Sequence, residues 1–299
     1  MNKYVVYLEW PEQCFRVDAA ALAQLRTLVP AKSRIVRVRN DEEFLKELPT
    51  ATHAIVWHFK EEWFAAAKRL RLLATPSAGR ELIPQALSPQ PSAPSPIIHF
   101  GGFHGPAIAE SVLGYMLSWC RGILRRPGKK IWERVELGDK CYTLAGTKAT
   151  ILGYGKIGKA IGEKLSCLGV AVKGISRKNF SELGAAVKSS DWLVCVLPSD
   201  TGTDNLVDAR LIGKLPPRCV VINVGRGNAI DEEALKAALC EGRIAGAILD
   251  VVKREPPKKG DTLFSGSIPN LTIMSHSAAF YPDYVKDCFD ELSREGLLQ

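Results

Sequence analysis

Short apolar runs alternate with amphipathic segments through the first quarter of the chain. Strand spacing of apolar positions recurs at residues 4–8, 34–38, 53–59 and 71–75, and helical spacing recurs at 19–28, 41–48 and 61–70. Strands that alternate with helices favour a parallel sheet with helices on its faces. Because the first strand begins at the very start of the sequence, we expect no signal peptide.

The alternation resumes in the second half of the chain, after a long apolar helical pattern at 106–124. Strands are predicted at 147–152, 170–175, 192–197, 219–224, 246–251 and 271–274, and helices at 156–168, 208–214 and 231–241. The Pro- and Ser-rich segment 87–96 can be neither helix nor central strand, because proline lacks a backbone N–H group. It predicts a connector between two α/β domains.

The composition is that of an ordinary globular protein. The 299 residues are 46% hydrophobic and 24% charged, with no apolar run long enough to cross a membrane. None of the eight cysteines forms a Cys-x-x-Cys pair, so we expect no metal site and no redox pair. Scattered thiols in apolar runs are typical of a reducing compartment, and we expect a cytoplasmic protein.

The formal net charge of +8 leaves two interpretations open, because the basic residues are spread along the chain. The densest cluster, Arg125–Lys130, contains no aromatic residue that could stack on a base. A solvated loop, or a positive potential that attracts an anionic cofactor and substrate, fits this pattern better than nucleic-acid binding.

A glycine-rich loop, Gly153–Gly158, separates a predicted strand from a predicted helix. Gly153 would permit the tight turn, Gly155 would let a pyrophosphate approach the backbone, and Gly158 would let the helix pack closely on the strand. The pyrophosphate would lie at the positive end of the helix. Such a pattern can also be a turn without a ligand, but the strand–loop–helix context favours dinucleotide binding.

The end of the next strand bears on the choice of cofactor. An acidic residue there would hold the ribose hydroxyls of NAD, whereas this chain has Ser176-Arg177-Lys178. Two cations and a hydroxyl can bind a 2′-phosphate, so we predict that NADP(H) is preferred and that NAD(H) is possible. The alternative is that Arg177 and Lys178 only face solvent.

Three ionisable residues follow successive predicted strands. Arg226, Glu255 and His276 come just after the strands at 219–224, 246–251 and 271–274. Each could be an ordinary loop residue by itself. Because ligands of open α/β sheets bind at the carboxyl ends of the strands, the three together predict a catalytic set.

These motifs together resemble the D-2-hydroxyacid dehydrogenase family. The matching stretches are 144–158, 223–227 with Asp231, 249–251 with Glu255 and Pro256, 275–276, and 77–79. The resemblance implies two Rossmann-like α/β domains with parallel sheets. A flavodoxin-like substrate domain would comprise residues 1–98 and 280–299, and a dinucleotide-binding domain residues 99–279. It also implies a homodimer.

The resemblance further implies roles for individual residues. Arg226 would grip the substrate carboxylate and polarise the 2-oxo group, and His276 would donate a proton to the carbonyl oxygen. Glu255 would pair with His276 and favour its protonated form. The backbone N–H groups of Ala78 and Gly79 would help to hold the carboxylate. The expected cofactor contacts are Gly153, Gly155, Lys156, Ile157, Gly158, Ser176, Arg177, Lys178, Leu197, Pro198, Thr203, Val224, Gly225 and Asp250, the last on the nicotinamide amide.

The sequence thus predicts an oxidoreductase that transfers hydride from NAD(P)H to a small anionic 2-oxo acid, such as glyoxylate or hydroxypyruvate, giving a D-2-hydroxy acid. A non-enzymatic, corepressor-like protein that senses NAD(P) is the alternative from the same fold. Oxidation of another small anion, such as phosphite or formate, is a third. No nucleic acid, membrane or metal partner is expected.

Overall fold

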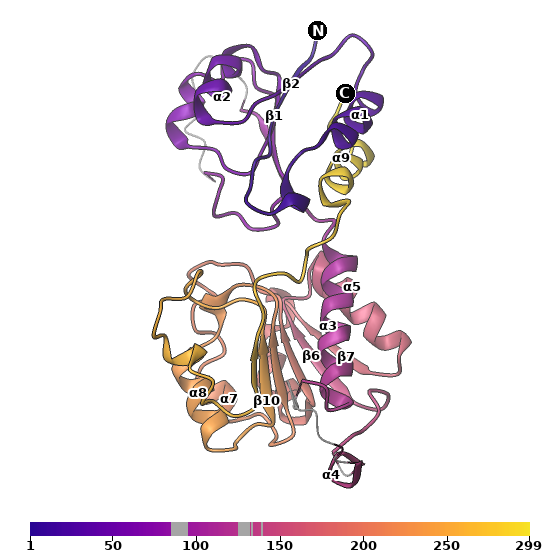
Figure 1. Ribbon diagram of the computed structural model, residues 1–299, viewed down its shortest axis with the longest axis vertical. Helices are drawn as coiled ribbons and strands as arrows, with labels where there is room; N and C mark the ends of the chain where they lie inside the picture. Colours follow the sequence, from indigo (N-terminus) through magenta and orange to yellow (C-terminus); the bar gives the residue numbers. More distant parts are fainter. Residues whose placement is uncertain (85–94, 125–131, 133, 139) are drawn as a thin grey trace. The chain divides into compact units, whose positions relative to one another are not determined.

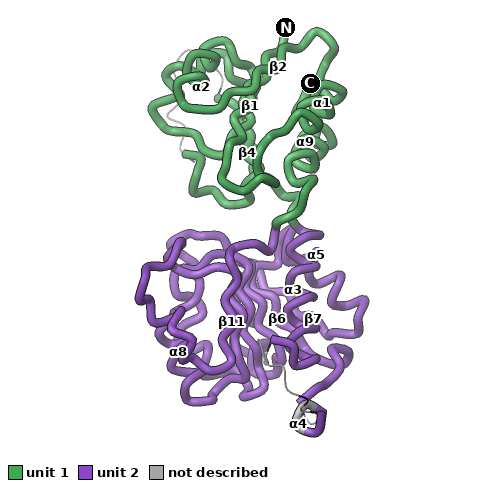
Figure 2. The backbone as a smooth tube through the Cα atoms, in the orientation of Figure 1, with its two compact units in different colours: residues 1–104, 280–299 green, residues 105–279 purple. Residues whose placement is uncertain are grey.

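The computed structural model describes residues 1–84, 95–124, 132, 134–138 and 140–299. The first eight residues of the predicted connector and the whole basic cluster 125–130 lie outside these residues. The described chain forms two compact units, shown in different colours in Figure 2: unit 1 comprises residues 1–104 and 280–299, and unit 2 comprises residues 105–279.

The first boundary differs from the expected one at residues 98 and 99. Strand β5 (Ile97–Phe100) spans that point and pairs along its whole length with β4 (Leu72–Thr75). Because its backbone hydrogen bonds go to β4, β5 belongs to unit 1, which continues to residue 104. Sequence analysis missed β5, since it directly follows the Pro- and Ser-rich segment.

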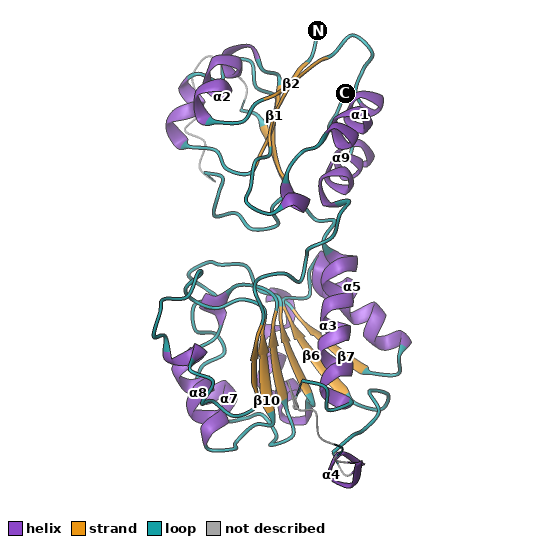
Figure 3. Cartoon of the chain, viewed as in Figure 1, coloured by secondary structure: helices purple, strands orange, loops and turns teal. Residues whose placement is uncertain are grey.

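Unit 1 is built on a five-stranded parallel sheet in the order β2-β1-β3-β4-β5. Its other strands are β1 (Lys3–Tyr7), β2 (Arg34–Arg37) and β3 (His53–Val56). Figure 3 labels β1 and β2 of this sheet. This is the flavodoxin-like order 2-1-3-4-5, so the α/β prediction for this part of the chain is confirmed.

The helices of unit 1 cover both faces of the sheet. They are α1 (Ala19–Leu28), α2 (Asp41–Glu47) and α9 (Tyr284–Arg294), with 3-10 turns η1 (Gln13–Phe15), η2 (Leu48–Thr50) and η3 (Glu61–Ala65). Helix α1 begins where the Asp18 carboxylate accepts a hydrogen bond from the Ala21 N–H group, and α2 where Asn40 accepts one from Glu43. Figure 1 shows α1 and α9 side by side.

The prediction of a helix at 61–70 is wrong beyond residue 65. Only the 3-10 turn η3 forms, with tight hydrogen bonds such as that from the Ala66 N–H group to the Trp63 carbonyl oxygen. Trp63 is buried against the rings of Phe44 and Phe59. The burial of this one large side chain overrides the helical spacing of the segment.

Helix α9 ties the C-terminal segment into unit 1. The Tyr4 hydroxyl donates to the Leu298 carbonyl oxygen at 2.9 Å. The His99 ring lies between two carboxylates of the segment, with Nε2 3.3 Å from Glu291 and Nδ1 3.2 Å from Glu295. Glu291 also accepts two hydrogen bonds from the Gly102 N–H group. These contacts hold residues 284–298 against β1 and β5.

Unit 2 is built on a six-stranded parallel sheet in the order β11-β10-β9-β8-β6-β7. The strands are β6 (Lys148–Leu152), β7 (Ala171–Ile175), β8 (Trp192–Cys195), β9 (Val220–Asn223), β10 (Gly246–Leu249) and β11 (Leu271–Ile273). The helices are α3 (Gly105–Cys120), α4 (Arg134–Gly138), α5 (Lys156–Cys167), α6 (Leu183–Ala186), α7 (Ala209–Ile212) and α8 (Glu232–Cys240), with turns η4 (Arg177–Glu182), η5 (Val187–Ser189), η6 (Gly227–Ala229) and η7 (Thr262–Phe264).

Helices cover both faces of this sheet, with α3 and α5 packed together on one face and α7 and α8 on the other (Figure 1). Side chains alternate between the faces along each strand, so Val194 enters the core under α3 and α5 while Leu193 enters the core under α7 and α8. Burial on both faces explains the uninterrupted apolar strand signals in the sequence.

The sheet of unit 2 also has six strands, but relative to the usual dinucleotide-binding order 3-2-1-4-5-6 it lacks the strand beyond β7 and has one more strand at the opposite edge. Counted from β6, its order is 2-1-3-4-5-6, because the segment between β7 and β8 forms only η4, α6 and η5. Strand β7 is therefore an edge strand, and the residues that follow it lead directly into a short crossover. In the part of the chain that the structure describes, no helix has the length and apolar character needed to cross a membrane.

Candidate active site

The glycine loop joins β6 to α5, and two of its three glycines are required for steric reasons. Gly153 has a φ of 102°, in the region that favours glycine, and a Cβ there would overlap the Val196 carbonyl oxygen. A Cβ at Gly158 would overlap the carbonyl oxygen of Gly153. These two glycines bring α5 tightly against the turn that follows β6.

Gly155 differs from its neighbours because a Cβ there would meet no atom of the described chain within 4 Å. It is the N-cap of α5 and has no side chain to cap the helix. Lys156 is exposed and Ile157 half-buried in the first turn of the helix. Open space beside a helix N-terminus fits the pyrophosphate of a dinucleotide, which would occupy that space.

The predicted 2′-phosphate loop is ordered by a residue that sequence analysis missed. The Asn179 carboxamide oxygen accepts hydrogen bonds from the Ser176 N–H group at 2.8 Å and from its hydroxyl at 3.1 Å, and Asn179 Nδ2 donates to the Gly174 carbonyl oxygen. Arg177 and Lys178 are exposed, and their side chains make no ion pair with other described residues. The loop thus presents two cations beyond a fixed Ser176.

Two further predicted cofactor segments lie against each other. Thr203 is buried, and its hydroxyl lies 2.8 Å from the Pro198 carbonyl oxygen and accepts a hydrogen bond from the Asp200 N–H group. A Cβ at Gly225 would collide with the backbone of Leu197, at 2.5 Å from its nitrogen. Only a glycine at residue 225 therefore lets the β9 loop approach the β8 loop so closely.

Arg226 follows β9, and hydrogen bonds with Asn223 and Gly225 hold it in place. The Asn223 side chain donates to the Arg226 carbonyl oxygen at 3.0 Å and accepts a hydrogen bond from the Gly225 N–H group at 3.1 Å. Val224 is buried between them, and its N–H group donates to the Cys195 carbonyl oxygen. The guanidinium of Arg226 is half-buried, with Nη1 bound to the Gly225 carbonyl oxygen at 2.9 Å.

Glu255 and His276 follow the adjacent strands β10 and β11, and they are in contact. His276 Nδ1 lies 2.7 Å from Glu255 Oε2, while Glu255 Oε1 accepts a hydrogen bond from the Val252 N–H group at 2.9 Å. Burial raises the pKa of Glu255. The hydrogen bonds from His276 and Val252 and the charges of His276 and Arg226 outweigh it, so the pKa lies below its usual value.

Asp250, the last predicted cofactor residue, is buried at the end of β10. Its carboxylate accepts hydrogen bonds from the N–H groups of Ser277 and Ala278, both at 3.0 Å, and from the Tyr115 hydroxyl at 3.3 Å. A carboxylate has about four acceptor positions, so one remains. The structure therefore directs Asp250 mainly to the loop that carries His276.

Ala78 and Gly79 lie in unit 1, in the loop that follows β4. Ala78 is exposed and Gly79 is buried. The Gly79 N–H group donates to Ser77 Oγ at 3.1 Å, and the Ser77 N–H group donates to Thr75 Oγ1 at 3.2 Å. Of the two backbone groups expected to hold a carboxylate, that of Gly79 is thus already paired.

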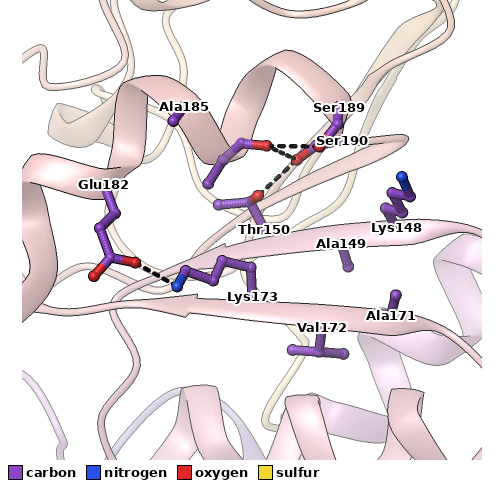
Figure 4. A pocket seen from close by; sticks show the side chains of 11 residues that line it. Lys148, Ala149, Thr150, Ala171, Val172, Lys173, Glu182, Ala185, Ser189 and Ser190 are labelled. Atoms are coloured by element: carbon purple, nitrogen blue, oxygen red, sulfur yellow. Dashed lines mark hydrogen bonds and ion pairs between the residues drawn. The ribbon is translucent and has the colours of Figure 1, made fainter.

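A cavity of about 440 Å³ lies elsewhere in unit 2, on the face of β6 and β7 that the short crossover covers (Figure 4). Thr150 and Ser190 share a hydrogen bond at its wall, and Lys173 forms an ion pair with Glu182 at its rim. None of the residues predicted for cofactor or substrate lines it. It reflects the small side chains and the few helical residues between β7 and β8.

Sequence analysis missed the residues that hold the predicted site residues in place. Asn179 stands three positions after Ser176, which is the spacing of a helix-capping box and was a usable signal. Asn223 and Tyr115 gave weaker signals. Each is a polar group within an apolar run, and only the fold reveals that it reaches a loop at the carboxyl end of the sheet.

Comparisons with known proteins point to one family. The family model for the NAD-binding domain of D-isomer specific 2-hydroxyacid dehydrogenases matches residues 113–278. Glycerate dehydrogenase of Methylorubrum extorquens is 28% identical over 219 residues, which cover 70% of this chain and 69% of that protein. Hydroxypyruvate reductase of Thermotoga maritima is 26% identical over 227 residues, which cover 72% of each.

The fold also has counterparts among solved structures. An NADPH-dependent glyoxylate/hydroxypyruvate reductase from Sinorhizobium meliloti, in complex with NADP and sulfate, aligns with a TM-score of 0.75 at 21% identity and covers 98% of this chain and 93% of that one. Because the family match extends over more than half of the sequence, the chain belongs to the D-isomer specific 2-hydroxyacid dehydrogenases, a family of NAD(P)-dependent oxidoreductases that act on small 2-hydroxy or 2-oxo acids.

Proposed function

We propose that the protein reduces a small 2-oxo acid to a D-2-hydroxy acid and that Arg226, Glu255 and His276 are its catalytic set. The contact of 2.7 Å between His276 and Glu255 carries this proposal. Arg226 follows the neighbouring strand β9, and its charge acts on Glu255. An imidazole paired with an ionised carboxylate, beside a guanidinium, is an acid with an anion-binding group.

The chemistry follows from the positions of these groups. Arg226 would bind the substrate carboxylate with its planar fork and draw electrons from the adjacent 2-oxo group. Glu255 holds the Nδ1 side of His276, which leaves Nε2 to donate a proton to the carbonyl oxygen. A nicotinamide dinucleotide held at the glycine loop would supply the hydride for the carbonyl carbon. Proton and hydride together complete the reduction of the carbonyl to an alcohol.

Two predicted contacts complete the proposed site. The remaining acceptor position of Asp250 would take the nicotinamide amide. The N–H groups of Ala78 and Gly79 would add donors to the substrate carboxylate, with Gly79 exchanging its bond to Ser77 for one to the substrate.

We propose NADP(H) as the preferred cofactor. No carboxylate stands at the end of β7 to repel a 2′-phosphate, and exposed Arg177 and Lys178 flank the fixed Ser176. A guanidinium group binds phosphate through strong charge-assisted hydrogen bonds. The reductase from Sinorhizobium meliloti, similar in fold, was solved with NADP.

We propose a homodimer as well, in line with the family resemblance. Ile123, Trp132 and Val135 have 64%, 88% and 82% of their surface exposed, in and beside the segment that leads from α3 to α4. A dimer interface would remove these apolar side chains from water. Sedimentation equilibrium should give twice the chain mass, and Trp132→Ser should shift the equilibrium toward the monomer.

The non-enzymatic alternative gains no support, because the relatives described above carry the names of enzymes. Purified protein should oxidise NADPH, followed by absorbance, in the presence of glyoxylate or hydroxypyruvate. Phosphite and formate, each with NADP, belong to the same panel. A folded protein that binds NADPH but turns over no 2-oxo acid would disprove the proposal.

A further inference from the structure

The backbone of the loop that carries His276 donates three hydrogen bonds to one residue at the end of the neighbouring strand β10. The His276 N–H group donates to the Asp250 carbonyl oxygen at 2.8 Å. The Ser277 and Ala278 N–H groups donate to Asp250 Oδ1 and Oδ2, each at 3.0 Å. His276 has a φ of 52°, which non-glycine residues adopt rarely, so this loop depends on its hydrogen bonds for its shape.

Helix α3 supplies two side chains to the same loop. The Tyr115 hydroxyl donates to Asp250 Oδ1 at 3.3 Å, and the Ser111 hydroxyl donates to the Ala278 carbonyl oxygen at 2.9 Å. Ser111 and Tyr115 stand four positions apart and therefore share one face of the helix. Tyr115 thus contacts Asp250, which supports the loop, and Ser111 contacts the loop itself.

Tyr115 is suited to act as a permanent donor. Burial raises the pKa of its hydroxyl, and the charge and hydrogen bond of Asp250 raise it further, so the group keeps its proton at working pH. Asp250 is only 2% exposed. A buried carboxylate that loses one of its donors is destabilised and moves toward other partners.

We propose that Tyr115 is a positioning residue for His276, acting through Asp250, and that Ser111 assists it from the same helix face. Neither side chain is assigned to the substrate or the cofactor. Tyr115 fixes the Asp250 carboxylate, Asp250 fixes the backbone of residues 276–278, and that backbone sets where the imidazole meets its proton acceptor. This inference rests on the proposed role of His276 in the reduction.

Tyr115→Phe tests the proposal because it removes one hydroxyl and keeps the ring. Since an imidazole out of place slows proton transfer but leaves the binding groups intact, kcat should fall roughly tenfold, with KM for NADPH and for the 2-oxo acid within about twofold of the wild type. Tyr115→Phe combined with Ser111→Ala should lower kcat further. Tyr281→Phe is the matched control, because it removes a similar bond, from Tyr281 to Asp287, in unit 1.

A second measurement does not depend on turnover. The chain has five histidines, so the ring Cε1–H signals of protein with labelled histidine are few, and His276→Asn assigns the signal of His276. In Tyr115→Phe this signal should shift or broaden by exchange, while the other four stay in place. Tyr281→Phe should leave the His276 signal unchanged.

The outcomes separate this inference from the proposed function. A wild-type protein without any 2-oxo acid reduction defeats the proposed function, and the histidine spectra still report whether Tyr115 restrains His276. An unmoved His276 signal together with unchanged kcat in Tyr115→Phe overturns the inference. A variant with raised KM but normal kcat also overturns it, because Tyr115 would then act on binding.

Discussion

Nδ1 of His276 lies 2.7 Å from Oε2 of Glu255, although the two residues stand 21 positions apart in the sequence. Two parallel neighbouring strands, β10 and β11, end at the same edge of the sheet and bring the side chains together. The pair is partly exposed, so its solvent-facing side is accessible to a substrate.

This contact predicts how the two residues act together. His276→Asn should lower kcat by about 10²–10⁴-fold, the range of a lost general acid, and Glu255→Gln should lower it less, because the imidazole remains. The double variant should be no slower than His276→Asn, since residues that act as one unit are not additive. Steady-state assays with NADPH and a 2-oxo acid measure all three.

The control for this series is Glu110→Gln. Glu110 forms a surface ion pair with Lys164 at 2.8 Å, in a contact between α3 and α5, and its loss should leave kcat unchanged. Strictly additive losses in the double variant would contradict the proposed pairing of Glu255 with His276.

The loop after β7 predicts the cofactor preference. Arg177→Ala should raise the Kd for NADPH by about tenfold or more and leave the Kd for NADH nearly unchanged, because only NADPH carries the 2′-phosphate. Fluorescence titration with both cofactors measures the effect. Lys188→Ala, an exposed cation of the same crossover, is the control. Equal losses for both cofactors would show that Arg177 does not bind the 2′-phosphate.

The glycine loop predicts opposite results for two similar substitutions. Gly155→Ala should leave the apoprotein as stable as the wild type, because its Cβ meets no described atom, and should weaken NADPH binding at least roughly tenfold by filling the pyrophosphate space. Gly158→Ala should cost about 1–3 kcal/mol of stability, because its Cβ overlaps the Gly153 carbonyl oxygen.

Thermal unfolding without cofactor and NADPH titration distinguish these two cases. A Gly155→Ala protein that binds NADPH normally would rule out the proposed position of the pyrophosphate.

His53 predicts a pH dependence of stability. It is buried, and burial, with the charge of Arg71, lowers its pKa from 6.5 to about 4. As the pH falls from 6.5 toward 4, the unfolded chain binds a proton that the native protein does not, so the free energy of unfolding falls, by up to about 3 kcal/mol.

Urea unfolding at pH 7, 6 and 5 measures this slope. His53→Phe keeps a ring to stack on Tyr4 and removes the titrating group, so its slope should be shallower than that of the wild type. Identical slopes would show that His53 is not responsible.

Much of the fold could be predicted because both sheets are buried on two faces. Strands such as Trp192–Cys195 are apolar throughout, and the predicted strands coincide with them to within a few residues. Strand β5 and helix α9 were not predicted as elements. The first is short and follows prolines, and the second is held mainly by distant residues such as Tyr4 and His99.

The candidate site also contains residues that could be predicted from the sequence and residues that could not. Residues that carry chemistry, such as Arg226 and His276, could be predicted because their types and their places after strands are informative. Residues that hold them, such as Tyr115, could not, because their role depends on a helix face meeting a loop far along the chain. The paired N–H group of Gly79 is likewise visible only in the structure.

Helix α9 also determines when unit 1 can complete its fold during synthesis. Unit 2 is one continuous stretch of sequence, so all of it has been translated before residues 284–294. Unit 1 begins the chain, yet its side of α1 stays open until α9 emerges and packs there. Although domains near the N-terminus generally fold first during synthesis, unit 1 can complete its core only after the whole of unit 2 has been translated.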